Sequence, residues 1–187
     1  MNDKILIIGH GRELLYAKRG PEIDAFPGKL VRFSEYVING YEERVGTREN
    51  FYFIAGYSKY IYDNLLFRNH DRTYIYCTEA QPNNAKWVQN IINANERNIN
   101  IILPWDIVCK GRDEVTGNGR YLTSGVMAIY YFLSIEYEVY IIGFDFMQLG
   151  QEYFKTGTEP ISCVCHDYIA EKKWVENLLK EGKIRKF

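Results

Sequence analysis

The sequence has no excess of charge of either sign: 23 basic residues stand against 24 acidic ones, for a formal net charge of -1. A dedicated DNA- or RNA-binding role is therefore disfavoured, because such proteins concentrate positive charge to neutralise phosphates. A long hydrophobic run is also missing, since the opening apolar segment KILII is too short for a signal peptide or a membrane span. We therefore expect a protein of the cytoplasm, or of a host cell's cytoplasm, without a membrane anchor.

Cysteine is scarce and badly spaced for a metal site. The chain has Cys77, Cys109, Cys163 and Cys165, and the one close pair reads CxC rather than CxxC. Structural zinc and a disulfide framework are therefore disfavoured, and four mostly buried free thiols in a reducing compartment are expected. No repeat, low-complexity tract or linker divides the sequence, so residues 1–187 are expected to form one domain.

Short apolar runs alternate with segments of helical periodicity. The runs cover residues 4–8, 29–33, 50–54, 73–77, 100–103 and 139–142, and helices are predicted over 85–94, 122–135 and 168–180. This alternation predicts an α/β fold with a mainly parallel sheet. Ligands of such sheets bind at the carboxyl ends of the strands. We therefore expect the loops after Ile8, Phe33 and Ile142, and the helix that begins near Thr123, to surround a common cleft.

Two glycine-containing segments lie at these positions. Gly9-His10-Gly11 follows the first strand, where glycine lets the backbone approach a phosphate or ribose. The turn lacks the third glycine of the dinucleotide fingerprint, and a plain strand-to-helix turn explains it equally well. Thr123-Ser124-Gly125 opens an apolar helix, where a hydroxyl can cap the helix and the free amides of its first turn can bind an anion. Capping alone requires no ligand.

A histidine at the start of the last helix is the candidate general base. His166 has the type of side chain that takes a proton from an attacking hydroxyl at neutral pH, although a histidine there is more often a cap or a surface residue. Glu171 lies five positions on, so its facing His166 does not follow from the spacing. Asp106, Asp113 and Asp145 are far apart in the sequence, so no metal site is expected.

Taken in order, these segments resemble the motif series of the eukaryotic and viral sialyltransferases, glycosyltransferase family 29. The long motif of that family is similar to residues 8–11, 20–24, 31–34 and 41–48, and its short motif is similar to residues 123–125 through 139–144. Its last motif, His-x-x-x-x-Glu, matches His166 and Glu171. Its third motif has a blurred counterpart in residues 151–154.

The resemblance implies a Rossmann-like domain, similar to a variant of the GT-A glycosyltransferase fold. It implies inverting transfer of a sugar from CMP-sialic acid, or a related CMP-sugar, to a hydroxyl of a glycan or another acceptor, without a metal or cofactor. His166 is the implied base and Glu171 supports the last helix or the histidine. The implied donor-binding residues are Gly9, His10, Gly11, Ser34, Thr123, Ser124, Gly125, Gly143, Phe144 and Tyr153.

Each donor-binding residue has an implied part. The first glycine turn lines the nucleotide pocket, residues 123–125 hold the phosphate, and Gly143 and Phe144 flank the cytidine. Tyr153 or Gln151 takes the place of the family's histidine at the leaving phosphate. His10 and Ser34 stand where the family has asparagines, which leaves the sugar open. Two alternatives stay open as well: hydrolysis of a nucleotide sugar in the same cleft, and a catalytically inactive nucleotide-binding module.

Overall fold

The chain folds around one parallel sheet. The computed structural model describes residues 3–55, 70–77, 86–94, 99–150, 152–155 and 165–187. Among these, seven strands are ordered β5-β4-β3-β2-β1-β6-β7, and every neighbouring pair is parallel. The strands are β1 (Lys4–Ile8), β2 (Lys29–Phe33), β3 (Phe51–Ala55), β4 (Arg72–Tyr76), β5 (Ile99–Ile102), β6 (Glu138–Ile142) and β7 (Ile184–Lys186). The predicted α/β fold with a parallel sheet is confirmed.

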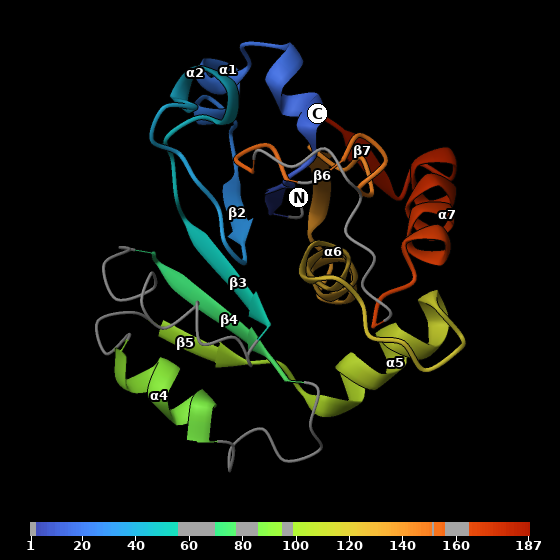
Figure 1. The fold of residues 1–187 in the computed structure, drawn as a ribbon. Coiled ribbons are helices and arrows are strands. Elements are labelled where there is room, and N and C mark those ends of the chain that lie inside the picture. The colour runs from blue at the N-terminus through green and yellow to red at the C-terminus, as the bar shows by residue number, and fades with distance from the viewer. Residues whose placement is uncertain (1–2, 56–69, 78–85, 95–98, 151, 156–164) are drawn as a thin grey trace.

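Helices connect the strands and cover the sheet (Figure 1). They are the 3-10 helix η1 (Arg12–Tyr16) and the α-helices α1 (Gly20–Asp24), α2 (Glu42–Val45), α4 (Lys86–Ala94), α5 (Trp105–Val115), α6 (Ser124–Ser134) and α7 (Tyr168–Lys180). The predicted helices over 85–94, 122–135 and 168–180 correspond to α4, α6 and α7. The sequence patterns did not reveal α5 or the short edge strand β7.

Side chains alternate between two buried faces of the sheet, as the two-residue period of a strand requires. In β1, Ile5 and Ile7 join the core cluster that contains α6, whereas Leu6 and Ile8 join the cluster formed with η1, α1 and α2. All four side chains are buried. Burial on both faces explains why the strand sequences are continuously apolar rather than alternating.

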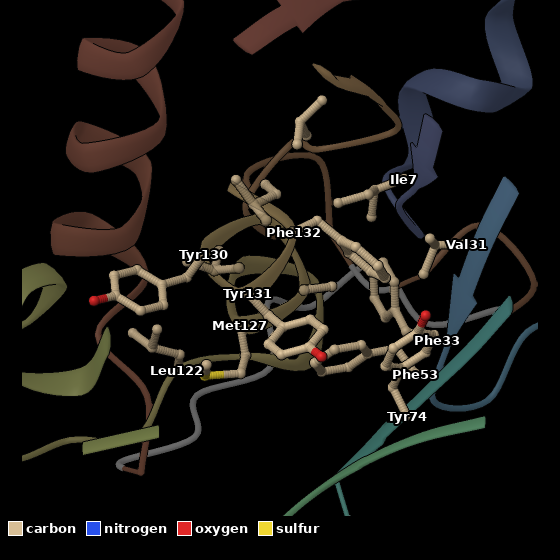
Figure 2. Close-up of a cluster of buried hydrophobic side chains, with 14 of the residues drawn as sticks. Ile7, Val31, Phe33, Phe53, Tyr74, Leu122, Met127, Tyr130, Tyr131 and Phe132 are labelled. Carbon is tan, nitrogen blue, oxygen red and sulfur yellow. The ribbon is translucent and has the colours of Figure 1, made fainter. Parts of the chain in front are cut away.

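The helix α6 is the centre of the first core cluster. Its residues from Gly125 to Phe132 are all buried, which explains a sequence that is apolar almost all round. Figure 2 shows Tyr131 and Phe132 of α6 against the strands, and their rings lie 5.6 Å and 5.1 Å from the ring of Tyr74. This packing fixes α6 against the sheet. The start of α6 is thereby held at the carboxyl ends of the strands.

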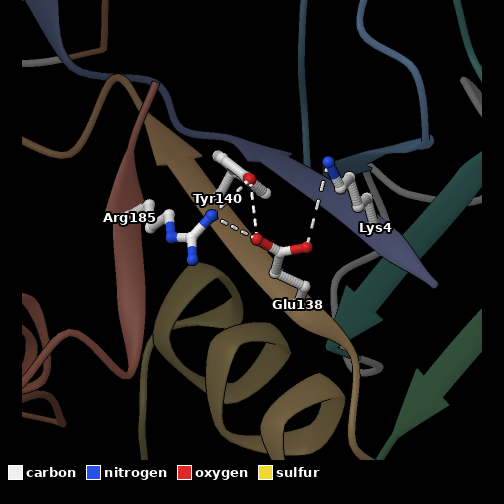
Figure 3. A network of polar contacts seen from close by, with 4 residues as sticks. All are labelled: Lys4, Glu138, Tyr140 and Arg185. Carbon is white, nitrogen blue, oxygen red and sulfur yellow. Dashed lines mark hydrogen bonds and ion pairs between the residues drawn. The ribbon is translucent and has the colours of Figure 1, made fainter. Parts of the chain in front are cut away.

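A polar network joins β1, β6 and β7 near the beginnings of β1 and β6 (Figure 3). Glu138 accepts hydrogen bonds from Tyr140, at 2.8 Å, and from Arg185, and its second oxygen lies 4.0 Å from the Lys4 ammonium. Lys4 and Glu138 are register partners between β1 and β6, as are Tyr140 and Arg185 between β6 and β7. The network thus links the short edge strand to the centre of the sheet.

The cysteine prediction is wrong for one residue. Cys77 is buried and Cys109 half-buried, and both carry thiols, but Cys165 is disulfide-bonded. Cys163 lies outside the described residues. Among the helices that the structure describes, none is long and apolar enough to span a bilayer.

Candidate functional site

Two glycine turns meet where β1 and β6 end. The amide of Gly9 donates to the Ile142 carbonyl at 2.7 Å, and the amide of Gly11 donates to the Gly143 carbonyl at 2.8 Å. A Cβ atom on Gly9 would collide with the carbonyl of Gly143, which itself has a φ of 77°. Glycine is therefore required at positions 9 and 143, because no larger residue allows the two backbones to approach so closely.

The start of α6 lies beside these turns. Thr123 is its N-cap residue, yet the Thr123 side chain makes no capping hydrogen bond, contrary to the simplest expectation for this position. Its hydroxyl donates instead to Glu171 Oε2 at 2.8 Å, and its amide donates to Glu171 Oε1 at 2.7 Å. The first-turn amides of α6 are consequently left without a side-chain cap, which is the arrangement of an anion site at a helix N-terminus.

Two predicted donor-binding hydroxyls are brought together at this helix start. Ser34, which follows β2 with a φ of 50°, donates from Oγ to Ser124 Oγ at 2.8 Å. Tyr76, the last residue of β4, donates to the Leu122 carbonyl at 3.2 Å and lies 3.5 Å from Ser124 Oγ. Ser124 accepts the bond from Ser34, and because the Tyr76 hydrogen goes to Leu122, Ser124 can direct its own hydrogen to the Tyr76 oxygen or to another acceptor.

A small cavity of about 70 Å³ joins these elements. Eight of the predicted site residues line it: Gly9, His10, Gly11, Thr123, Gly125, Gly143, Phe144 and Glu171. Further residues of the wall that sequence reasoning missed are Phe33, Val126, Asp145, Phe146, Met147 and Tyr168. Ser34, Ser124, Tyr153 and His166 are outside this lining. The volume is below that of common ligand pockets, which hold several hundred Å³.

His166 lies just before α7, and its ring orientation is fixed by a carbonyl. Its Nδ1 atom is 2.8 Å from the Tyr121 carbonyl oxygen. A carbonyl only accepts hydrogen bonds, so Nδ1 carries the hydrogen and, in the neutral ring, Nε2 carries the lone pair. Arg120 donates to the His166 carbonyl at 3.4 Å. The next residue, Asp167, caps α7 by accepting from the Ala170 amide at 3.0 Å.

Glu171 contacts α6 rather than the histidine. Its side chain is completely buried, and both oxygens are bound to Thr123. Burial raises the pKa of Glu171 to about 7, although the two bonds from Thr123 lower it. Among the described residues, no hydrogen bond or ion pair joins Glu171 to His166.

His10 is enclosed by aromatic rings. Its ring stacks on Phe33 at 4.5 Å and lies edge-on to Phe154 at 5.6 Å. Burial lowers the pKa of His10 to about 3, so the ring is neutral at physiological pH. Its Nε2 atom is buried without a hydrogen-bond partner in the described part of the chain.

Tyr153 is buried and holds two loops together. Its hydroxyl donates to the Val37 carbonyl and accepts from the Val37 amide at 3.3 Å. Its ring packs edge-on against Tyr41 at 5.1 Å. The alternative candidate Gln151 lies outside the described residues.

Asp145 shapes the part of the cavity wall that the sequence did not predict. Its carboxylate accepts from the amides of Arg12 at 2.9 Å and Met147 at 3.0 Å, and burial raises its pKa. The neighbouring Phe146 and Met147 both adopt positive φ, at 52° and 59°. Non-glycine residues rarely do so, and such backbone strain clusters at functional sites. Among the described residues, no three His, Cys, Asp or Glu side chains are grouped to hold a metal ion.

Comparison with family profiles matches residues 4–183 to glycosyltransferase family 29 (sialyltransferase). The chain belongs to this family. The predicted resemblance is thereby confirmed, and the chain is a glycosyltransferase. A search of curated protein sequences finds no match.

Solved sialyltransferases share the fold of this family member. A mammalian sialyltransferase is 21% identical, with a TM-score of 0.71, over 100% of this chain and 69% of that one. The sialyltransferase CST-II in complex with a trisaccharide acceptor and CMP is 17% identical, with a TM-score of 0.58, over 99% of this chain and 80% of that one. CstII from Campylobacter jejuni with the substrate analogue CMP-3FNeuAc is 19% identical, with a TM-score of 0.55, over 100% and 80% of the two chains.

Proposed function

We propose that the chain transfers a sugar from a CMP-sugar donor to an acceptor hydroxyl, with inversion and with His166 as the base. The family supports sugar transfer, and the complexes of CST-II with CMP and of CstII with CMP-3FNeuAc support a CMP-linked donor. The complex of CST-II with a trisaccharide supports a glycan acceptor. The identity of the transferred sugar is left open by His10 and Ser34.

One observation carries the assignment of the base. The Tyr121 carbonyl accepts from Nδ1 of His166, and this leaves the Nε2 lone pair of the neutral ring to take a proton. His166 lies two residues before Tyr168, and Tyr168 lines the cavity. In the proposed step, the acceptor oxygen bonds to the anomeric carbon while its proton passes to Nε2. The bond from that carbon to the CMP phosphate breaks, and CMP leaves.

The leaving phosphate is proposed to bind at the start of α6. The uncapped amides there, and the Ser124 hydroxyl once its hydrogen turns from the Tyr76 oxygen to the phosphate, would stabilise the negative charge that grows on the phosphate as the bond breaks. CMP is a good leaving group, so positioning and charge stabilisation supply the catalysis and no metal is required. Activity should therefore persist in EDTA. Complete loss in EDTA, restored by Mn²⁺ or Mg²⁺, would contradict the metal-independent mechanism.

The base assignment is tested by His166→Ala. Loss of a general base should lower kcat by roughly 10²–10⁴, with CMP affinity little changed. The matched control is Ile169→Ala, since Ile169 lies three residues further along the chain, on α7, and is 84% exposed. Its turnover should equal that of the unsubstituted protein. Undiminished turnover in His166→Ala would refute the base assignment.

Product analysis separates the alternatives. The protein is incubated with CMP-sialic acid, with and without a glycan acceptor. Transfer yields a sialylated acceptor, whereas hydrolysis yields free sugar even without acceptor. An inactive module would bind CMP but release neither product.

A further inference from the structure

One hydrogen bond at the start of α6 can run in either direction. The Thr123 hydroxyl and Glu171 Oε2 are 2.8 Å apart, while Glu171 Oε1 accepts from the Thr123 amide at 2.7 Å. Both residues line the cavity, and Glu171 is completely buried. The Thr123 hydroxyl is not used as a helix cap. The protonation state of Glu171 therefore decides where the hydroxyl hydrogen of Thr123 points.

The two states differ in what Thr123 can offer a ligand. An ionised carboxylate only accepts, so the hydroxyl of Thr123 must donate to Glu171 and presents only lone pairs to the cavity. A protonated Glu171 donates from Oε2 to the Thr123 oxygen, while Oε1 still accepts from the amide. The hydroxyl hydrogen of Thr123 is then released to donate to another acceptor. One proton enters from solvent, and no covalent bond other than that O–H bond forms.

We infer that binding of the donor phosphate at the start of α6 is coupled to uptake of one proton by Glu171, which turns the Thr123 hydroxyl toward the phosphate. The inference rests on the proposed function and adds a positioning role for Glu171. An anion next to the carboxyl group disfavours its charged form, and a phosphate oxygen accepts the released hydrogen. Both effects act in the same direction.

The surrounding groups favour such a proton uptake. Burial already holds the pKa of Glu171 at about 7 before any ligand binds, and the nearby Asp167 carboxylate raises it. The other titratable groups around it are Tyr168 on the same helix and, in the cavity wall, Asp145 and the neutral His10. Burial raises the pKa of the Tyr168 phenol, and the carboxylates of Glu171 and Glu152 raise it further. None of these groups brings a positive charge that would keep Glu171 ionised.

Proton uptake is measured by titration calorimetry at pH 7.5 in PIPES, HEPES and Tris, whose ionisation enthalpies differ. The ligand is CMP-3FNeuAc, whose phosphate is a diester and does not titrate near neutral pH. At pH 7.5 a carboxyl group with a pKa of about 7 is mostly ionised, so binding that leaves Glu171 protonated should take up roughly 0.5–0.8 proton. Binding without buffer dependence would overturn this inference and leave the proposed function standing. Absence of any binding by CMP-3FNeuAc and by CMP would overturn both.

Three variants assign the proton. Glu171→Gln imitates the protonated acid, because its amide donates to the Thr123 oxygen and its carbonyl accepts from the Thr123 amide. It should bind the analogue at least as tightly as the unsubstituted protein, without proton uptake. Thr123→Val keeps the shape but removes the hydroxyl, and affinity should fall about 10-fold or more, as for loss of a hydrogen bond to a charged group. Thr123→Ser should restore it.

A purely structural role for Glu171 gives different results. In that case Glu171→Gln would change the melting temperature but not the proton count. Uptake that persists in Glu171→Gln would therefore refute the assignment. His166→Ala should keep the uptake, because the His166 ring contacts Tyr121 and not Glu171. Loss of the uptake in His166→Ala would assign the proton to the histidine and overturn the inference.

Discussion

Replacing Gly125 by alanine at the start of α6 has two opposing effects on stability: alanine favours the helix, but its methyl group crowds neighbouring side chains. A Cβ atom on Gly125 would lie 2.7 Å from Phe33 Cζ and 2.8 Å from Phe144 Cε1. Ordinary contact begins at 3.4 Å, so both rings must move away from the new atom. Phe33 cannot do so easily, because its ring stacks on His10 at 4.5 Å.

The expected net effect is a modest loss of stability. Alanine in place of glycine gains about 1 kcal/mol of helix propensity, whereas overpacking a core costs about 1–3 kcal/mol. The difference is a loss of roughly 1 kcal/mol, which lowers the melting temperature by about 2–4 °C in a protein of this size. The loss in CMP binding free energy should exceed this loss of stability, because the added methyl group displaces the two rings next to the proposed phosphate site.

Thermal unfolding and CMP titration of Gly125→Ala test this reasoning. Gly111→Ala in α5 is the matched control, because the three atoms nearest to a Cβ there all belong to the ring of Tyr130, at 3.0–3.2 Å. Its stability should be equal or higher, and its CMP affinity unchanged. If Gly125→Ala instead raised the melting temperature and kept full CMP affinity, the close contact of this helix start with Phe33 and Phe144 would not matter to the site.

Two further substitutions test the surroundings of the cavity. Tyr153→Phe removes the hydroxyl bound to Val37. It should lower the free energy of unfolding, measured by chemical denaturation, by about 1 kcal/mol and leave CMP affinity unchanged. A loss of CMP affinity beyond 10-fold would place Tyr153 at the leaving phosphate. His10→Phe tests acid sensitivity. Burial lowers the pKa of His10 to about 3, so below pH 6.5 the unfolded chain binds a proton that the folded chain does not. Stability is therefore lost as the pH falls, by about 3 kcal/mol between pH 6.5 and 4, and urea denaturation should show a flatter acid limb for His10→Phe. An identical acid limb would refute the buried neutral ring.

Much of the fold could be predicted because its signals are local. Apolar runs of four or five residues, such as KILII, predicted six of the seven described strands. Gly182 has a φ of 69° just after α7, the left-handed conformation that glycine adopts readily at the end of a helix. The helix α5 was missed because its apolar positions are interrupted by Asp106, Lys110 and Arg112. The strand β7 was missed because only Ile184 of its three residues is buried, and its pairing with β6 is set by tertiary contacts.

The site was predictable in position but not in its pairings. Strand ends and glycine turns located the cleft, since the carboxyl ends of parallel strands meet at one edge. Nothing in the sequence indicates that Ser34 donates to Ser124, 90 positions further along the chain. The bond from Thr123 to Glu171 was likewise not predictable. A threonine at the start of a helix usually caps that helix, so the sequence favours a local partner for its hydroxyl. Side chains that serve a site depart from such local preferences.

The spacing between His166 and Glu171 has a physical reason that a single-helix view cannot supply. Residues five apart do not face each other on a helix, and here only Glu171 is helical, because Asp167 caps α7 between them. His166 instead binds the carbonyl of Tyr121, and Glu171 binds the amide and hydroxyl of Thr123. Two residues of one motif thus hold a three-residue segment from both ends. Three hydrogen bonds between the segment and the motif thereby fix the proposed base relative to the proposed phosphate site, which is how a rigid constellation keeps reacting groups in register.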